Sequence, residues 1–320
     1  MTTKTSTETV VLVAGRCWDG LARRPSGHTE VVVRGGCVAE VGDRVDRKAG
    51  RVVDLGGRML LPGFIDCHVH TTMDPSALLT AFGADAATVI ALRALPVLRD
   101  LLDRGFTTVR DLATFTGEPI TIHLRDALER GLITGPRMLV APHLISARGA
   151  HGDLSTLLAP EYGREIGVLA DGPAEVTRAV RAEIRAGADW IKFGATGGFG
   201  SPTDDPGQAT YTQSEMDALV ATAADLGVPC TPHAYGDEGV ARAVRAGVRC
   251  VEHGFWFPPS SWSSTRWTTS TTRATGRART LPSGRSSTVM RTNSETAHAM
   301  WPPATCASPS VPTQACSRIA

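Results

Sequence analysis

Short apolar runs alternate with longer amphipathic stretches between residues 60 and 253 of this chain. The apolar runs, which end in polar residues and predict β-strands, are Leu60–His70, Thr107–Arg110, Arg137–Leu144, Trp190–Phe193, Val228–His233 and Val248–Glu252. Stretches with the period of an α-helix stand between them, among them Ala86–Arg104, Glu175–Ala186 and Glu215–Leu226. This alternation is typical of βα units that build a parallel sheet covered by helices.

Local signals indicate where some of these helices begin and end. Thr212 and Glu215 have the T-x-x-E spacing of a capping box, and Gly227 and Gly247 stand where a helix gives way to the next strand. A barrel is the closed form that repeated βα units favour. We therefore predict an α/β fold, a (β/α)8 TIM-like barrel over residues 61–257 that is incomplete here, with six βα units.

The first 60 residues have a different pattern. Val10–Val13, Glu30–Val33 and Cys37–Val41 are β-rich runs separated by glycine-containing turns such as Gly35-Gly36. They predict a small N-terminal β-layer over residues 1–60, before the larger domain.

Composition adds a boundary that the periodicity alone does not show. The 320 residues are 42% hydrophobic and carry 33 basic and 32 acidic groups, which excludes a wholly disordered chain and gives no reason to expect a nucleic-acid partner. After about Phe257, however, the last 63 residues hold seven Arg, no Lys, 12 Ser and 12 Thr, with Glu295 as their one acidic residue. We predict that residues 258–320 are a disordered Ser/Thr/Arg-rich tail.

The expected compartment is the cytoplasm. The seven cysteines are odd in number and form no C-x-x-C pair. The first ten residues are polar, unlike a signal peptide, and no run reaches the roughly 18 apolar residues that span a bilayer. We therefore expect no membrane partner.

Two histidines stand two residues apart at the end of the first predicted barrel strand. Because side chains alternate along a strand, His68 and His70 point to one face while Cys67 and Val69 point to the other. Two imidazoles so placed can chelate one divalent metal ion. The alternative is a pair of polar residues at a strand end, one of them partly buried.

Two more histidines follow predicted strands, where barrel enzymes keep their active sites. His233 ends the run that begins at Val228, and His253 follows the run that begins at Val248. Each alone could be an ordinary loop histidine. Four histidines at three strand ends can converge in space, although they lie far apart in sequence.

Lys192 lies inside the apolar strand Trp190–Phe193, which a parallel sheet buries on both faces. Because burying an ammonium group is costly, its pKa should fall and the neutral amine should become reactive. The alternative is a lysine whose amine reaches solvent at the strand end.

Taken in order, these motifs resemble the amidohydrolase superfamily, over residues 8–257. The resemblance rests on the His-x-His run after Pro-Gly-Phe-Ile-Asp, the Ile-Lys-Phe strand followed by Ala-Thr-Gly-Gly, the His-Ala-Tyr-Gly run at 233–236 and the Glu-His-Gly run at 252–254. The likeness is greatest to imidazolonepropionase-like and prolidase-like metal-dependent hydrolases. It implies a barrel beside a composite β-sandwich, to which residues 1–60 contribute, and a centre of one or two metal ions, usually Zn2+.

The resemblance also implies a set of metal ligands. His68 and His70 would bind the more buried ion, and His233 and His253 the second. Lys192, carboxylated by carbon dioxide, would bridge the two. Carboxylation suits a neutral amine, because it turns a buried cation into an anionic oxygen ligand.

The implied reaction is hydrolysis of a C–N bond by metal-activated hydroxide, in a small peptide of the Xaa-Pro type or a cyclic amide. Lys192, His151 and Tyr235 are the candidate catalytic residues, the last two as donors to a developing oxyanion. A structural loop role stays open for His151 and Tyr235. The expected partner is a small-molecule or dipeptide substrate, and a homo-oligomer is compatible with the sequence.

The sequence departs from the family pattern near its end. Family members place a metal-binding, proton-shuttling aspartate after the eighth strand, but no Asp occurs here after Asp237. We interpret the segment after about Phe257 as translated out of frame, with a divergent natural tail as the alternative. The rival to an active enzyme is a catalytically inactive remnant that at most binds metal.

Overall fold

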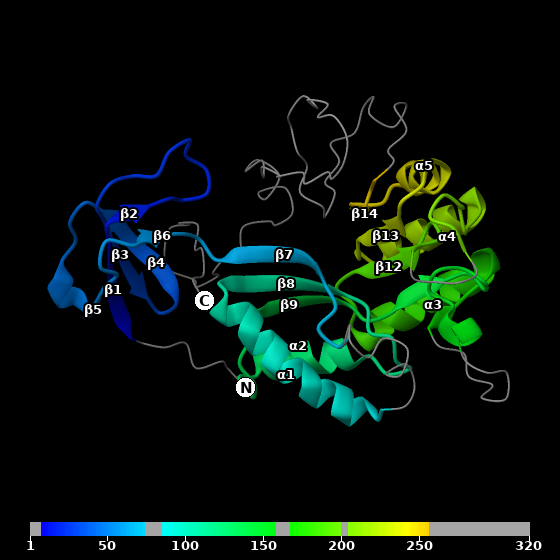
Figure 1. The fold of residues 1–320 in the computed structure, drawn as a ribbon, viewed down its shortest axis with the longest axis horizontal. Coiled ribbons are helices and arrows are strands. Elements are labelled where there is room, and N and C mark those ends of the chain that lie inside the picture. Colours follow the sequence, from blue (N-terminus) through cyan, green and yellow to red (C-terminus); the bar gives the residue numbers. More distant parts are fainter. Residues whose placement is uncertain (1–7, 74–84, 158–166, 200–203, 256–320) are drawn as a thin grey trace, which may run out of the picture. The chain divides into compact units, whose positions relative to one another are not determined.

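The computed structural model describes residues 8–73, 85–157, 167–199 and 204–255 (Figure 1). Contacts divide the chain between Phe64 and Ile65 into two compact units. The tail predicted for residues 258–320 lies outside the described residues. Within the described part, no helix is both long enough and apolar enough to cross a membrane.

The N-terminal unit contains a four-stranded sheet of order β4-β3-β1-β5 and a two-stranded sheet of β2 and β6. Its strands are β1 (Thr9–Ala14), β2 (Arg16–Cys17), β3 (Thr29–Arg34), β4 (Cys37–Gly42), β5 (Arg51–Asp54) and β6 (Met59–Leu60). Val11, Val13 and Val32 are buried together in its core. The three strands predicted here are thus present as β1, β3 and β4, while the composite β-sandwich stays a prediction.

The second unit is a TIM-barrel-like α/β arrangement of strands and helices. Its strands are β7 (Phe64–Val69), β8 (Phe106–Leu112), β9 (Arg137–Ala141), β10 (Leu144–Ser146), β11 (Val168–Leu169), β12 (Ile191–Gly194), β13 (Cys230–Ala234) and β14 (Glu252–His253). Its helices are α1 (Ala87–Asp103), α2 (Ile120–Glu129), α3 (Gly172–Ala186), α4 (Gln213–Asp225) and α5 (Asp237–Ala246). Each of the six predicted runs overlaps a strand of this unit, β7, β8, β9, β12, β13 or β14, although the run Val248–Glu252 shares only Glu252 with β14.

The strands of this unit form two sheets, with the orders β7-β8-β9 and β11-β10-β12-β13-β14. Figure 1 labels β7, β8 and β9 of the smaller sheet and β12, β13 and β14 of the larger one. The β8–β9 pair and every pair of the larger sheet are parallel. Pro142 and His143 separate β9 from β10, and the hydrogen-bonded ladder changes sheet at this break. In the described part of the chain the two sheets do not close into a barrel.

Side-chain chemistry explains the limits of the helices that cover the larger sheet. Thr212 and Glu215 form the predicted capping box at the start of α4. Gly187 and Gly247 end α3 and α5 with φ of 108° and 92°, a left-handed conformation that glycine adopts without strain. The largest core cluster joins α3, α4 and α5 to β12 and β13, and it fixes the strand ends that carry the site.

Candidate functional site

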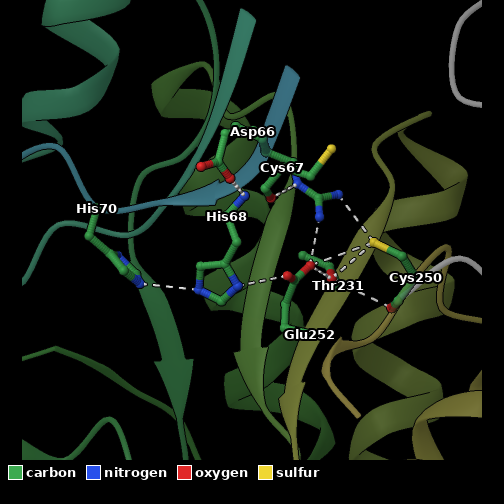
Figure 2. Close-up of polar contacts among 8 residues, drawn as sticks. Asp66, Cys67, His68, His70, Thr231, Cys250 and Glu252 are labelled. Carbon is green, nitrogen blue, oxygen red and sulfur yellow. Dashed lines mark hydrogen bonds and ion pairs between the residues drawn. The ribbon is translucent and has the colours of Figure 1, made fainter. Parts of the chain in front are cut away.

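Two histidines at the end of β7 form the centre of the site, His68 within the strand and His70 directly after it. The Nε2 atoms of His68 and His70 lie 3.3 Å apart (Figure 2). Each ring is also held at its other nitrogen: the Nδ1 atom of His68 lies 2.8 Å from a carboxylate oxygen of Glu252, and that of His70 lies 3.0 Å from the carbonyl oxygen of Ala113. The predicted alternation of β7 thus brings both imidazoles to one place.

These partners determine where the ring protons lie. A carbonyl oxygen can only accept, so the Nδ1 atom of His70 donates to Ala113. Although burial opposes ionisation of Glu252, the hydrogen bond from His68 and the charges of Lys192 and Arg110 hold the pKa of this carboxyl below its usual value. Glu252 is therefore an anionic acceptor, and both Nε2 atoms present lone pairs to each other.

Four other aromatic rings lie beside this pair. The His253 ring centroid lies 4.9 Å from that of His68 and 4.6 Å from that of His233. His151 stacks on His233 with centroids 4.0 Å apart. Tyr235 stacks on His253 at 4.6 Å. The structure therefore gathers all the histidines that the sequence singled out, together with Tyr235, into one cluster.

Lys192, on β12, is the lysine among the predicted site residues. It is 3% exposed, and its amine has no hydrogen-bond partner within the described residues. Burial lowers the pKa of Lys192 to about 8, although the charge of Glu252 opposes this shift. The structure thus shows the buried lysine and not the alternative in which the amine reaches solvent.

Burial also keeps the histidines in their neutral form. Burial and the neighbouring His68 lower the pKa of His70 to about 3. Burial and the charge of Lys192 lower the pKa of His253 to about 3. Burial lowers the pKa of three further imidazoles, which are those of His68, His151 and, most strongly, His233. Neutral imidazole is the form that binds a metal ion.

A buried polar network beside His68 was not assigned a role from the sequence. Glu252 on β14 and Arg110 on β8 are 0% and 3% exposed and form an ion pair of 2.7 Å. The oxygen of Glu252 that accepts from Arg110 also accepts from the hydroxyl group of Thr231. Arg110 donates in addition to the sulfur of Cys250, at 3.1 Å. A charged residue inside an apolar strand was the signal that selected Lys192, and it applies equally to Arg110 and Glu252.

Backbone strain is concentrated at the same site. Among the described non-glycine residues, only Ala113 and His253 have positive φ, at 126° and 67°. This conformation is costly for a residue with a Cβ atom and often marks functional positions. At Ala113 it accompanies the carbonyl group that accepts from His70.

The chemistry of the donors, rather than a preformed cage, is what fits a metal ion. Within the described ranges, no three or more His, Cys, Asp or Glu side chains are grouped so that they could hold one. The two facing Nε2 lone pairs nevertheless repel each other unless a cation or proton lies between them. Neutral imidazoles whose Nδ1 atoms donate to oxygen are the usual form of metal-binding histidines.

Comparisons with known proteins place these features in context. The sequence model described as "Amidohydrolase family" matches residues 59–257. The chain is 30% identical over 259 residues to the ochratoxinase of Aspergillus niger, covering 74% of this chain and 53% of that protein. It therefore spans about half the length of this curated relative.

Solved structures show the same likeness. A crystal structure of an Xaa-Pro dipeptidase with bound methionine is 30% identical, with a TM-score of 0.71, and the match covers 79% of this chain and 63% of that one. A prolidase complexed with N-methylphosphonate-L-proline is 37% identical, with a TM-score of 0.70 and coverages of 79% and 62%.

Proposed function

Because the chain belongs to the amidohydrolase family, we propose that it is a metal-dependent hydrolase that cleaves the C–N bond of an amide or peptide. The observation that carries the proposal is the pair of neutral imidazoles whose Nε2 lone pairs face each other at 3.3 Å. A bound divalent ion supplies a nucleophile from water at neutral pH and polarises the scissile carbonyl group.

The residues of this chain would hold that ion and the substrate. His68 and His70 would bind one ion, and His233 and His253 a second, with Zn2+ as the expected metal. Lys192 would be carboxylated, because its buried amine has no partner within the described residues and its lowered pKa makes the neutral, reactive form more accessible.

His151 and Tyr235 are proposed to orient the substrate. His151 stacks on the proposed ligand His233, and Tyr235 stacks on His253, so both adjoin the ion-binding rings. A phenol or imidazole N–H there could donate to a carbonyl oxygen as negative charge develops on it.

An Xaa-Pro dipeptide or a cyclic amide is the proposed substrate. Tyr235 contacts two exposed aromatic rings, with its centroid 4.9 Å from that of Phe199 and 5.5 Å from that of Phe255. Such a surface suits a compact apolar ring next to the scissile bond. Two of the solved structures to which the chain is similar are named for prolidase or Xaa-Pro dipeptidase activity, which supports the same choice.

Hydrolysis by the zinc-loaded chain tests this function. The chain is stripped with a chelator and titrated with Zn2+ while Xaa-Pro dipeptides, N-acyl amino acids and cyclic amides are assayed. We expect turnover that rises with zinc and is lost in His68→Ala. The matched control is His123→Ala, because His123 is an exposed histidine on α2.

The second candidate is an inactive remnant that binds metal, which the absence of an aspartate after Asp237 favours. Zinc binding that depends on His68, without turnover of any substrate in the panel, would support the remnant. Absence of zinc binding would contradict both candidates.

A further inference from the structure

We propose that the buried Arg110–Glu252 ion pair positions the candidate metal centre by holding His68 in one tautomer and one orientation. Glu252 acts here as a positioning residue, because it reaches the site through the imidazole of His68. The inference rests on the proposed metal-dependent function and assigns to these two residues a role within it.

Glu252 contacts the imidazole of His68 directly. One carboxylate oxygen of Glu252 lies 2.8 Å from the Nδ1 atom of His68. An anionic carboxylate can only accept, so it places the ring proton on Nδ1 and leaves the Nε2 lone pair free. That lone pair points towards the Nε2 atom of His70, at 3.3 Å (Figure 2).

The carboxylate of Glu252 is itself held against rotation. Its other oxygen accepts from Arg110 at 2.7 Å and from the hydroxyl group of Thr231. Glu252 is 0% exposed, so no water can replace a lost donor cheaply. Rotation of the carboxylate would take the negatively charged partner away from a buried guanidinium and an acceptor away from a buried hydroxyl group.

Arg110 is in turn held by several partners. Its Nε atom donates to the carbonyl oxygen of Cys67 at 2.8 Å, next to His68 in the chain. One Nη atom donates to the sulfur of Cys250 at 3.1 Å, and the guanidinium carbon lies 4.3 Å from the ring centroid of Trp190. Arg110 therefore connects β7, β8 and β14 around a single carboxylate.

Energetics favour a positioning role over a purely stabilising one. A buried ion pair loses the hydration of both charges, so apolar residues of similar volume would often give equal or greater stability. Here the two charges define the direction of one hydrogen bond to a proposed ligand. Outer partners of this kind fix the orientation and the tautomer of metal-binding histidines.

The chain contains a matched pair outside the site. His143 and Glu183 are 7% and 5% exposed, and the Nδ1 atom of His143 lies 2.9 Å from a carboxylate oxygen of Glu183. This pair has the same chemistry as His68 and Glu252, but no role in metal binding is proposed for it. It separates loss of a buried hydrogen bond from loss of positioning.

The first experiment measures the tautomer of His68 in the unmodified, metal-free chain. Long-range proton–nitrogen NMR of the imidazole rings distinguishes the two neutral forms, and the His68→Ala variant assigns the signal by its disappearance. We expect the proton on Nδ1. A proton on Nε2, or a mixture of both forms, would overturn the proposal.

The second experiment measures zinc affinity by competition with a chromophoric chelator. We expect Glu252→Gln to weaken binding about 10- to 100-fold, and Thr231→Val, which removes one donor to the carboxylate, to weaken it less. Glu183→Gln should leave the affinity unchanged. If Glu252→Gln does not fold, Thr231→Val carries the test, and unchanged affinity in the folded variants would refute the positioning role.

These readouts separate the inference from the proposed function. If His68 is protonated on Nδ1 but no hydrolysis is measured at any zinc concentration, the proposed function is contradicted and the positioning contact still stands. Zinc-dependent hydrolysis with His68 protonated on Nε2 would contradict the inference alone.

Discussion

Asp111 is a fully buried acid at the end of β8, and folding favours its neutral form. Burial raises the pKa of Asp111 to about 6, although hydrogen bonds from Thr71 oppose the shift. One carboxylate oxygen accepts from the backbone and hydroxyl groups of Thr71, and the other has no hydrogen-bond partner within the described residues. Ionisation of this carboxyl group therefore destabilises the folded state.

The pH dependence of unfolding tests this penalty. Because the pKa of Asp111 is raised in the folded chain, its contribution to stability is fully present below the pKa that it has in the unfolded chain, near 4. This contribution is lost as the pH rises through about 6. Relative to Asp111→Asn, the wild-type free energy of unfolding should therefore fall by about 2 to 3 kcal/mol between pH 4 and pH 7.5.

Urea unfolding of the metal-free chain at the two pH values measures this difference, and any constant cost of the amide cancels. Asp225→Asn is the control, because Asp225 is exposed at the end of α4. A difference between Asp111→Asn and wild type that does not change with pH would contradict the prediction.

Ala113 has a backbone conformation that suits glycine better than alanine. Its φ of 126° is strained for a residue with a Cβ atom, and its carbonyl oxygen holds the Nδ1 atom of His70. We expect Ala113→Gly to raise the free energy of unfolding by about 1 kcal/mol, since the strain relieved exceeds the entropy that glycine adds to the unfolded chain. Thermal unfolding provides the measurement. Ala141→Gly, in β9, should be destabilising, and equal losses in both variants would contradict the argument.

Among the helices, α4 has a clearly defined start. Thr212 accepts from the backbone of Glu215, whose side chain in turn accepts from the backbone of Thr212. Thr212→Ala removes one half of this exchange and should cost about 1 kcal/mol of unfolding free energy. Chemical denaturation measures the loss. Thr212→Ser, which keeps the hydroxyl group, should cost clearly less, and similar losses for both substitutions would show that the cap contributes little.

At this scale, local patterns predict elements but not the contacts between them. The six strand runs and the capping box depend on residues close in sequence, and all are present in the structure. The strands β10 and β11 have three and two residues, too few to show a period. The Arg110–Glu252 pair joins residues 142 positions apart, so only the folded chain reveals which charge neutralises which.

The same limit applies to the site. Alternation along β7 is enough to place His68 and His70 on one face, and the strand-end positions of His233 and His253 bring them close. The carbonyl of Ala113 could not be foreseen, because its direction depends on one strained φ angle. The ligand and catalytic roles of these residues stay predictions.

Over the whole chain, two kinds of sequence meet close to Phe257. The family match ends at residue 257, and the described strands end at β14. Beyond this point lie seven arginines, with one acidic residue, Glu295. The resemblance to the family implies a metal-binding aspartate after an eighth strand. This segment contains no aspartate.

Another reading frame of the coding DNA should supply it. GC-rich codons read out of frame yield the Arg, Ser, Thr, Pro and Trp that fill residues 258–320, whereas a folded barrel strand needs alternating or continuous apolar residues. We therefore expect that one of the other two frames after about codon 257 encodes two more βα units and an aspartate after the second strand. Resequencing codons 245–265 and translating all three frames decides the matter. If neither alternative frame restores such a strand, the segment is native to this chain, and the metal-binding remnant becomes the better description of the molecule.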